Sequence, residues 1–178
     1  MIKKRLFEYS AKLPIRLINR TPGERYLERY YLGKWLGFTA YLHRFVSPDG
    51  DEEVHDHPWR FALSLILCGG YREERMTRLC IDKGWVSVFK HLKPWRLNVI
   101  RGVDFHRIRE TKPETWSLFI HRPTIKPWGF LKKTDEGTCY HQPLDAKASR
   151  GWYLDAPLGA EVDRAALNVM TDKGANNG

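Results

Sequence analysis

The chain has 178 residues, of which 42% are hydrophobic and 13% aromatic, and this composition excludes a disordered protein. This length suits one well-filled domain. Lys and Arg exceed Asp and Glu by nine, so the charge favours anionic partners over cationic ones. The basic residues are spread along the chain without a long run, so the same charge also fits a surface that only keeps the protein soluble.

The cysteines and the hydropathy of the sequence predict the cellular location of the protein. Cys68, Cys80 and Cys139 make an odd set without CxxC spacing, which predicts free thiols in a reducing compartment and hence a cytoplasmic location. No run of about 18 apolar residues occurs, and the basic N-terminus turns polar before an apolar run of signal length develops. The sequence therefore predicts neither a membrane span nor a secretion signal.

Helix signals surround the segment RTPGERYLERYYLGKW and predict a helix from about Pro22 to Leu32. Thr21 can cap its N-terminus, Glu24 completes a capping box, and Gly33 can end it. Four residues at helical spacing would form one apolar stripe: Tyr26, Leu27, Tyr30 and Tyr31. We expect this helix to lie against a larger structure as a support.

From Gly37 onward the chain consists of short β-rich runs separated by turn residues. The expected strands lie in the runs GFTAYLHRFV, WRFALSLIL, YREERMTRLC, WVSVFK, WRLNVI, FHRIRE and WSLFIHRP. Strands of this kind, with no βαβ rhythm, predict an all-β sandwich or barrel. We divide the single domain into an N-terminal segment with its helix (1–36), a barrel (37–130) and an irregular C-terminal extension (131–178) that ends in a frayed tail, TDKGANNG.

The stretch VHDHPWRF carries the strongest chemical signal, because it places His55 and His57 two positions apart. Side chains alternate along an extended segment, so both imidazoles project to one side while Asp56 points away. His106 follows the turn RGVD, where a later strand begins. Three converging imidazoles suit Fe, Ni, Cu, Mn or Zn, so these histidines predict a metal site. An HxH on an ordinary polar face is the alternative reading of the same residues.

This arrangement resembles the cupin superfamily, whose members are double-stranded β-helix barrels of the jelly-roll type. The first cupin motif is a glycine, an HxH, a glutamate and a second glycine, and its matches here are Gly50, His55, His57 and Gly69 or Gly70. The second motif has a glycine shortly before a histidine, matched by Gly102 and His106, although its usual proline is Ile100. The resemblance covers residues 37–123, about half of the chain.

One departure from the cupin pattern determines what the resemblance implies. Where the family has its glutamate ligand, this sequence has Phe61 and Ala62. The remaining set is similar to the three-histidine site of thiol-dioxygenase-like cupins, in which iron keeps open positions for substrate and dioxygen. Fe(II) is thus the expected metal, with Zn, Ni or Mn as alternatives. Cupins that have lost the metal remain a competing reading, and the resemblance also implies a homodimer.

Further side chains are expected around the metal. His121 lies on the polar-bearing face of its strand and can serve as a general base, a fourth ligand or a rim residue. The hydroxyls of Tyr71 and Ser64 can hold substrate or a metal-bound water, so we assign His121 and Tyr71 as catalytic and Ser64 as substrate-binding. Three arginines flank the histidine segments and can form a fork for a carboxylate or phosphate: Arg60, Arg101 and Arg107.

Three functions are compatible with these residues. The first is a metal-dependent dioxygenase that acts on a small anionic substrate, with the metal on His55, His57 and His106. The second is a metal-free sugar-nucleotide epimerase or isomerase, in which a histidine abstracts a proton. The third is a non-enzymatic module that binds protein or nucleic acid through its positive charge, and of these partners nucleic acid is not favoured.

Overall fold

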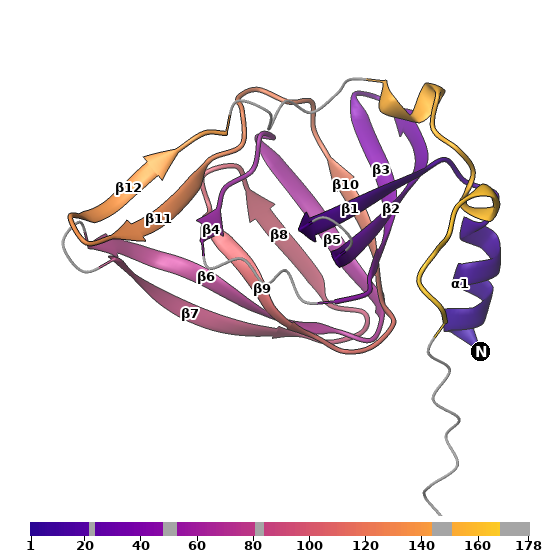
Figure 1. The fold of residues 1–178 in the computed structure, drawn as a ribbon, viewed down its shortest axis with the longest axis horizontal. Coiled ribbons are helices and arrows are strands. Elements are labelled where there is room, and N and C mark those ends of the chain that lie inside the picture. Colours follow the sequence, from indigo (N-terminus) through magenta and orange to yellow (C-terminus); the bar gives the residue numbers. More distant parts are fainter. Residues whose placement is uncertain (22–23, 48–52, 81–83, 144–150, 168–178) are drawn as a thin grey trace, which may run out of the picture.

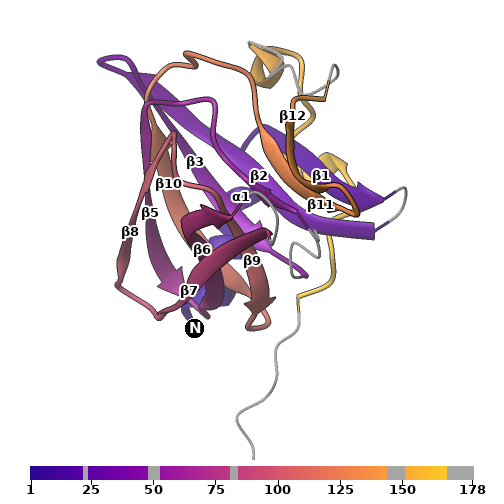
Figure 2. The same ribbon diagram turned by 90° about the vertical axis from the view of Figure 1, so that its left-hand side faces the viewer.

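The computed structural model describes residues 1–21, 24–47, 53–80, 84–143 and 151–167, and these form two antiparallel sheets (Figures 1 and 2). The first sheet has the order β1-β2-β3-β10-β5-β8 and the second β12-β11-β4-β9-β6-β7. The strands of the first sheet are β1 (Ile15–Thr21), β2 (Glu24–Trp35), β3 (Phe38–Phe45), β5 (Phe61–Cys68), β8 (Leu97–Arg101) and β10 (Thr115–His121). Those of the second are β4 (Val54–His55), β6 (Tyr71–Cys80), β7 (Gly84–Leu92), β9 (His106–Thr111), β11 (Phe130–Thr134) and β12 (Gly137–His141).

The expected all-β barrel of the jelly-roll type is confirmed, and its central strands follow the predicted alternation. In β5, burial alternates residue by residue, with Ala62, Ser64, Ile66 and Cys68 buried and the residues between them partly exposed. This period of two is the pattern of a strand with one face on a core. Strand β10 pairs with β3 on one side and β5 on the other, so it lies in the middle of the first sheet.

The helix predicted from Pro22 to Leu32 is wrong, because residues 24–35 form strand β2 between β1 and β3. Pro22 lies outside the described residues. Tyr30 is fully buried and stacks on Trp116 with ring centroids 6.0 Å apart. Tyrosines favour strands, and burial between two partners outweighs local capping signals. Gly33, expected to end a helix, follows a register shift in the β2–β3 pairing instead, with φ at 151°.

The helix of the N-terminal region lies earlier in the chain, as α1 (Ile2–Ser10). Its Leu6 and Phe7 pack against the core cluster that contains Tyr30 and Trp116. Figure 1 shows α1 on one side of the barrel and the β11–β12 hairpin on the opposite side. Among the described residues, no helix has the length and apolar character that a bilayer crossing requires.

The C-terminal region is less irregular than expected, because β11 and β12 form a hairpin that joins the second sheet through β4. Two short 3₁₀ turns follow, η1 (Trp152–Leu154) and η2 (Gly159–Glu161). Ala165 and Ala166 then accept hydrogen bonds from Arg44 of β3 at 2.7 and 3.0 Å. The described segment 151–167 therefore contacts the barrel, while the tail expected to fray lies outside the described residues.

Candidate metal centre

The register of two short pairings brings the three predicted histidines together. Strand β4 pairs with β9 at His55 opposite His106, and His57 follows β4 by two residues. One ligand atom from each of the three residues lies within 4.8 Å of the others. The predicted convergence of His55, His57 and His106 is confirmed. Gly50 of the first motif lies outside the described residues.

Hydrogen bonds hold Asp56, the residue between His55 and His57, in place. Asp56 is buried. Its carboxylate accepts a hydrogen bond from the backbone N–H of Gly129 at 2.9 Å and one from Lys126. The backbone at Gly102 lies close to the backbone at Trp59, since a Cβ on Gly102 would lie 2.0 Å from the carbonyl oxygen of Trp59. This close approach gives the second-motif glycine a steric reason.

His57 presents a neutral nitrogen to the cluster. Burial, with further contributions from His106 and His55, holds the pKa of His57 well below 6.5. Its Nε2 lies 2.5 Å from Nε2 of His106. Two nitrogen lone pairs at this separation repel each other unless one nitrogen carries a proton or a cation lies beside both. Three imidazoles that converge in this way are a donor set that fits a divalent first-row metal.

Glu73 of β6 contacts the histidine cluster, and sequence reasoning missed it. Its Oε1 contacts Nδ1 of His106, and it also accepts hydrogen bonds from Asn98 at 3.0 Å and Arg75 at 3.1 Å. Burial alone would raise the pKa of this carboxyl, but the hydrogen bond and charge of His106, together with Arg75 and Asn98, lower it to about 2. The ionised Glu73 therefore holds a proton on Nδ1 of His106 and leaves Nε2 as the metal-facing atom.

We expect Glu73→Gln to weaken metal binding about 10- to 100-fold, because the amide cannot orient the His106 imidazole as a carboxylate does. Affinity for Zn²⁺, measured by competition with a chromogenic chelator, tests this effect. Glu74→Gln is the matched control, since Glu74 binds Arg107 of β9 at 2.8 Å and does not contact the three histidines. Equal Zn²⁺ affinity of Glu73→Gln and the parent protein would contradict the orienting role.

A cavity of about 70 Å³ opens beside the histidines inside the barrel. The predicted residues Tyr71 and Ser64 both line it and are buried. Tyr71 accepts a hydrogen bond from Asn98 at 3.2 Å. Burial, with the charge of Glu73, raises the pKa of Tyr71 to about 12, so near neutral pH its hydroxyl stays protonated. It can donate a hydrogen bond to a ligand, but it is a poor base.

His121 lies beyond this cavity, on the wall of a larger one of about 390 Å³ that we call the vestibule. It stacks on Trp59 with ring centroids 4.4 Å apart, and its Nδ1 donates to the carbonyl of Arg122 at 2.6 Å. Burial lowers the pKa of His121 to about 4, so the ring is neutral near pH 7. Of the roles considered from the sequence, this position matches the rim residue.

The three arginines expected to form a fork are not brought together at the metal centre. Arg60 is exposed, Arg101 binds Asp104 with Nη2 2.9 Å from Oδ1, and Arg107 binds Glu74. Among the described residues that line the cavity beside the histidines, the arginine is Arg29 of β2. Its position escaped sequence reasoning because residues 22–32 were expected to form a supporting helix.

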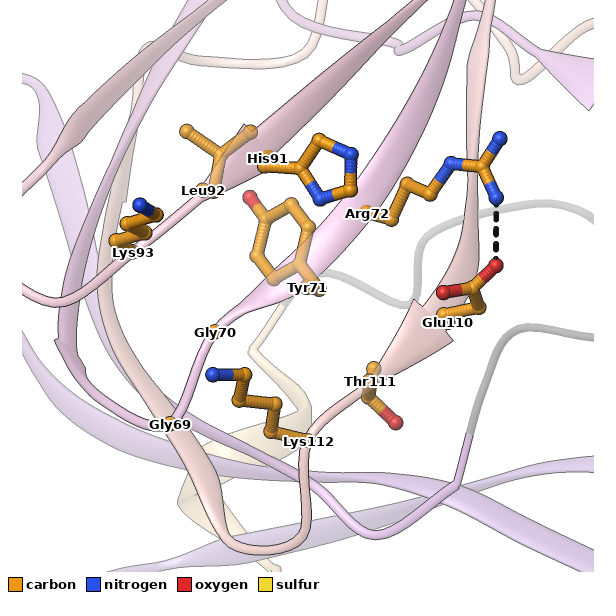
Figure 3. A pocket seen from close by; sticks show the side chains of 10 residues that line it. All are labelled: Gly69, Gly70, Tyr71, Arg72, His91, Leu92, Lys93, Glu110, Thr111 and Lys112. Atoms are coloured by element: carbon orange, nitrogen blue, oxygen red, sulfur yellow. Dashed lines mark hydrogen bonds and ion pairs between the residues drawn. The ribbon is translucent and has the colours of Figure 1, made fainter.

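A further hollow of about 210 Å³ lies where β6, β7 and β9 pass one another (Figure 3). Its charged side chains include Lys93, Lys112 and an ion pair between Arg72 and Glu110 at 2.7 Å. His91 lines it as well. Because none of His55, His57 and His106 lines this hollow, substitutions of its exposed residues serve as controls for variants of the metal centre.

Comparison with known proteins found similar solved structures but no similar sequence. No protein-family model matches the chain, and no curated protein is similar to it in sequence. Solved structures that resemble it include cupins. KdgF from Halomonas sp. is 12% identical, with 62% of this chain and 87% of that chain covered and a TM-score of 0.43. An RmlC-like cupin from Shewanella frigidimarina is 17% identical, with coverages of 64% and 86% and a TM-score of 0.44.

Several of the similar structures contain Fe(II). One of them is HEPD from Streptomyces albus with 2-hydroxyethylphosphonate and Fe(II) bound. It is 10% identical, the match covers 62% of this chain and 24% of HEPD, and the TM-score is 0.47. This chain thus spans about a quarter of the length of HEPD. At such identities the likeness concerns the fold alone, and chemistry has to be argued from the residues of this chain.

Proposed function

We propose that this protein is a mononuclear metal-dependent enzyme of the dioxygenase type, with Fe(II) on His55, His57 and His106 and a small anionic substrate. The observation that carries the proposal is the convergence of three ligand atoms within 4.8 Å beside an internal cavity. Three protein ligands leave coordination positions open, and a bound Fe(II) would use them to bring substrate and dioxygen together. The Fe(II) assignment rests on the all-imidazole donor set and on the resemblance to three-histidine cupins.

The residues around the cavity would supply positioning and exclusion of water. Glu73 keeps the His106 ring in one tautomer and one orientation. Tyr71 offers a hydroxyl proton to a polar group of the substrate, since its pKa of about 12 keeps it protonated. Trp59 and Trp128 lie against His57 with ring centroids 4.9 and 4.7 Å away, so apolar surface covers the cluster. A site shielded from bulk water strengthens the electrostatic interactions inside it.

Anaerobic loading with Fe(II) followed by nitric oxide tests the proposal without knowledge of the substrate. We expect close to one Fe(II) per chain and an S = 3/2 electron paramagnetic resonance signal, because nitric oxide binds an iron that keeps an open position. The chelator-treated protein is the control and should give no signal. Stoichiometric iron without the signal would contradict an open site. Failure to bind iron, zinc, nickel or manganese would contradict the metal-dependent function and favour the metal-free epimerase or isomerase.

A further inference from the structure

The vestibule beside the metal cavity concentrates positive charge. Its lining contains Arg16, Arg29 and Lys34, and among the described residues that line it there is no Asp or Glu. Arg16 and Lys34 are exposed, whereas Arg29 is half-buried. Positive side chains that line one concavity attract an anion into it. The charge distribution therefore points to an anionic ligand of more than one negative charge.

Arg29 occupies the boundary between the two cavities and lines both of them. Its Nε donates to Nε2 of His43 at 3.2 Å, and its guanidinium lies 5.3 Å from the ring centroid of Tyr41. Burial holds the pKa of His43 well below 6.5, so this ring is a neutral acceptor and does not balance the arginine charge. Across the described part of the chain, no carboxylate is paired with Arg29. Burying such a charge is costly unless a counter-ion completes the site.

The aromatic walls of the vestibule are held in place by stacking. Tyr153 stacks on Tyr31 with ring centroids 3.7 Å apart and planes 3° apart, and Trp152 stacks on Tyr41 at 6.0 Å. Trp59 and Trp128 line the vestibule as well as the metal cavity. Fixed aromatic faces bind flat or ring-shaped groups with little loss of side-chain entropy. A volume of about 390 Å³ is in the range of small-molecule sites.

We propose that the vestibule binds the phosphate ester group of a ring-bearing substrate. Arg29, with Arg16 and Lys34 at the rim, holds the dianion, and the aromatic walls contact the ring. The substrate's reacting end then extends past Trp59 and Trp128 toward His57. This last statement depends on the proposed function, whereas the anion site itself does not.

Binding of phenyl phosphate to chelator-treated protein, followed by tryptophan fluorescence, tests the anion site independently of the metal. Three tryptophans line the vestibule (Trp59, Trp128 and Trp152), so a bound ring should quench their emission. We expect phenyl phosphate to bind at least tenfold more tightly than benzoate or phenol, and the affinity to fall with added salt. Equal affinities for phenyl phosphate and benzoate would overturn the phosphate assignment, and absence of quenching would overturn the site.

Single substitutions test whether phenyl phosphate binds in the vestibule. Arg29→Gln should weaken phenyl phosphate binding roughly 10- to 100-fold, because charge-assisted hydrogen bonds are lost. The exposed Lys34→Gln, which carries little risk to folding, should weaken it several-fold, while Lys112→Gln in the hollow of Figure 3 should leave it unchanged. If Arg29→Gln and Lys34→Gln both retain the parent affinity, or if Arg60→Gln abolishes binding instead, the proposal is wrong. Loss of metal binding with phenyl phosphate binding intact would overturn the proposed function alone.

Discussion

The His57→Ala protein is expected to contain almost no divalent metal when it is purified without added metal, whereas the parent protein retains close to one ion per chain. Loss of a metal-contacting atom should cost more affinity than the 10- to 100-fold expected on losing a residue that only hydrogen-bonds a ligand, as Glu73 does. His57 is the ligand of choice for this test, because its Nε2 lies 2.5 Å from Nε2 of His106 at the centre of the cluster. Metal content measured by inductively coupled plasma mass spectrometry, with circular dichroism to confirm folding, gives the result.

The matched control for this experiment is His91→Ala. His91 belongs to β7 and lines the hollow of Figure 3, so its removal should leave the metal content unchanged. A second control, His141→Ala, removes a histidine whose Nε2 lies 2.8 Å from Glu53 outside the cluster. Equal metal content in His57→Ala and the parent protein would refute the three-histidine ligand set and with it the metal-dependent function.

The ligand set could be predicted because local rules determine most of it. Alternation along an extended chain puts His55 and His57 on one side, and this needs no knowledge of the partner strands. For His106 the sequence offered only its place after the turn RGVD and its match to the second cupin motif, because the pairing of His55 with His106 depends on strand register. Register is a tertiary property that one sequence does not display.

The residues that sequence reasoning missed are those whose role depends on neighbouring strands. Glu73 appears in the sequence as one charge among several in YREERM, and it becomes the partner of His106 because β6 pairs with β9. A glutamate at a position that faces the core was the available signal. Arg29 was hidden by capping signals that predicted a helix, whereas aromatic residues such as Tyr30 gain more from burial in the first sheet. Local propensity was outweighed by tertiary packing at this segment.

A buried ionic network is centred on Arg44 of β3. Arg44 is fully buried, with Nη2 2.6 Å from Oε1 of Glu114 and Nη1 3.0 Å from Oε2 of Glu28. Tyr30 donates to Glu28 at 2.7 Å, and Arg164 lies over the Phe7 ring at 3.7 Å. In this network the guanidinium of Arg44 contacts two carboxylates, whereas Arg29 is paired with no carboxylate among the described residues. The network therefore joins β2, β3 and the C-terminal segment, and it stabilises the fold.

We expect Arg44→Met to lower the free energy of unfolding by about 3 to 5 kcal/mol, because it removes the buried cation that contacts the carboxylates of both Glu28 and Glu114. The same change also removes the donors to Ala165 and Ala166, so the C-terminal segment should lose its anchor. Urea unfolding followed by circular dichroism measures the first effect, and limited proteolysis the second. Arg72→Met is the control, since its ion pair with Glu110 is exposed and should contribute less than about 1 kcal/mol. Similar losses in the two variants would show that the Arg44 network is no more stabilising than a surface ion pair.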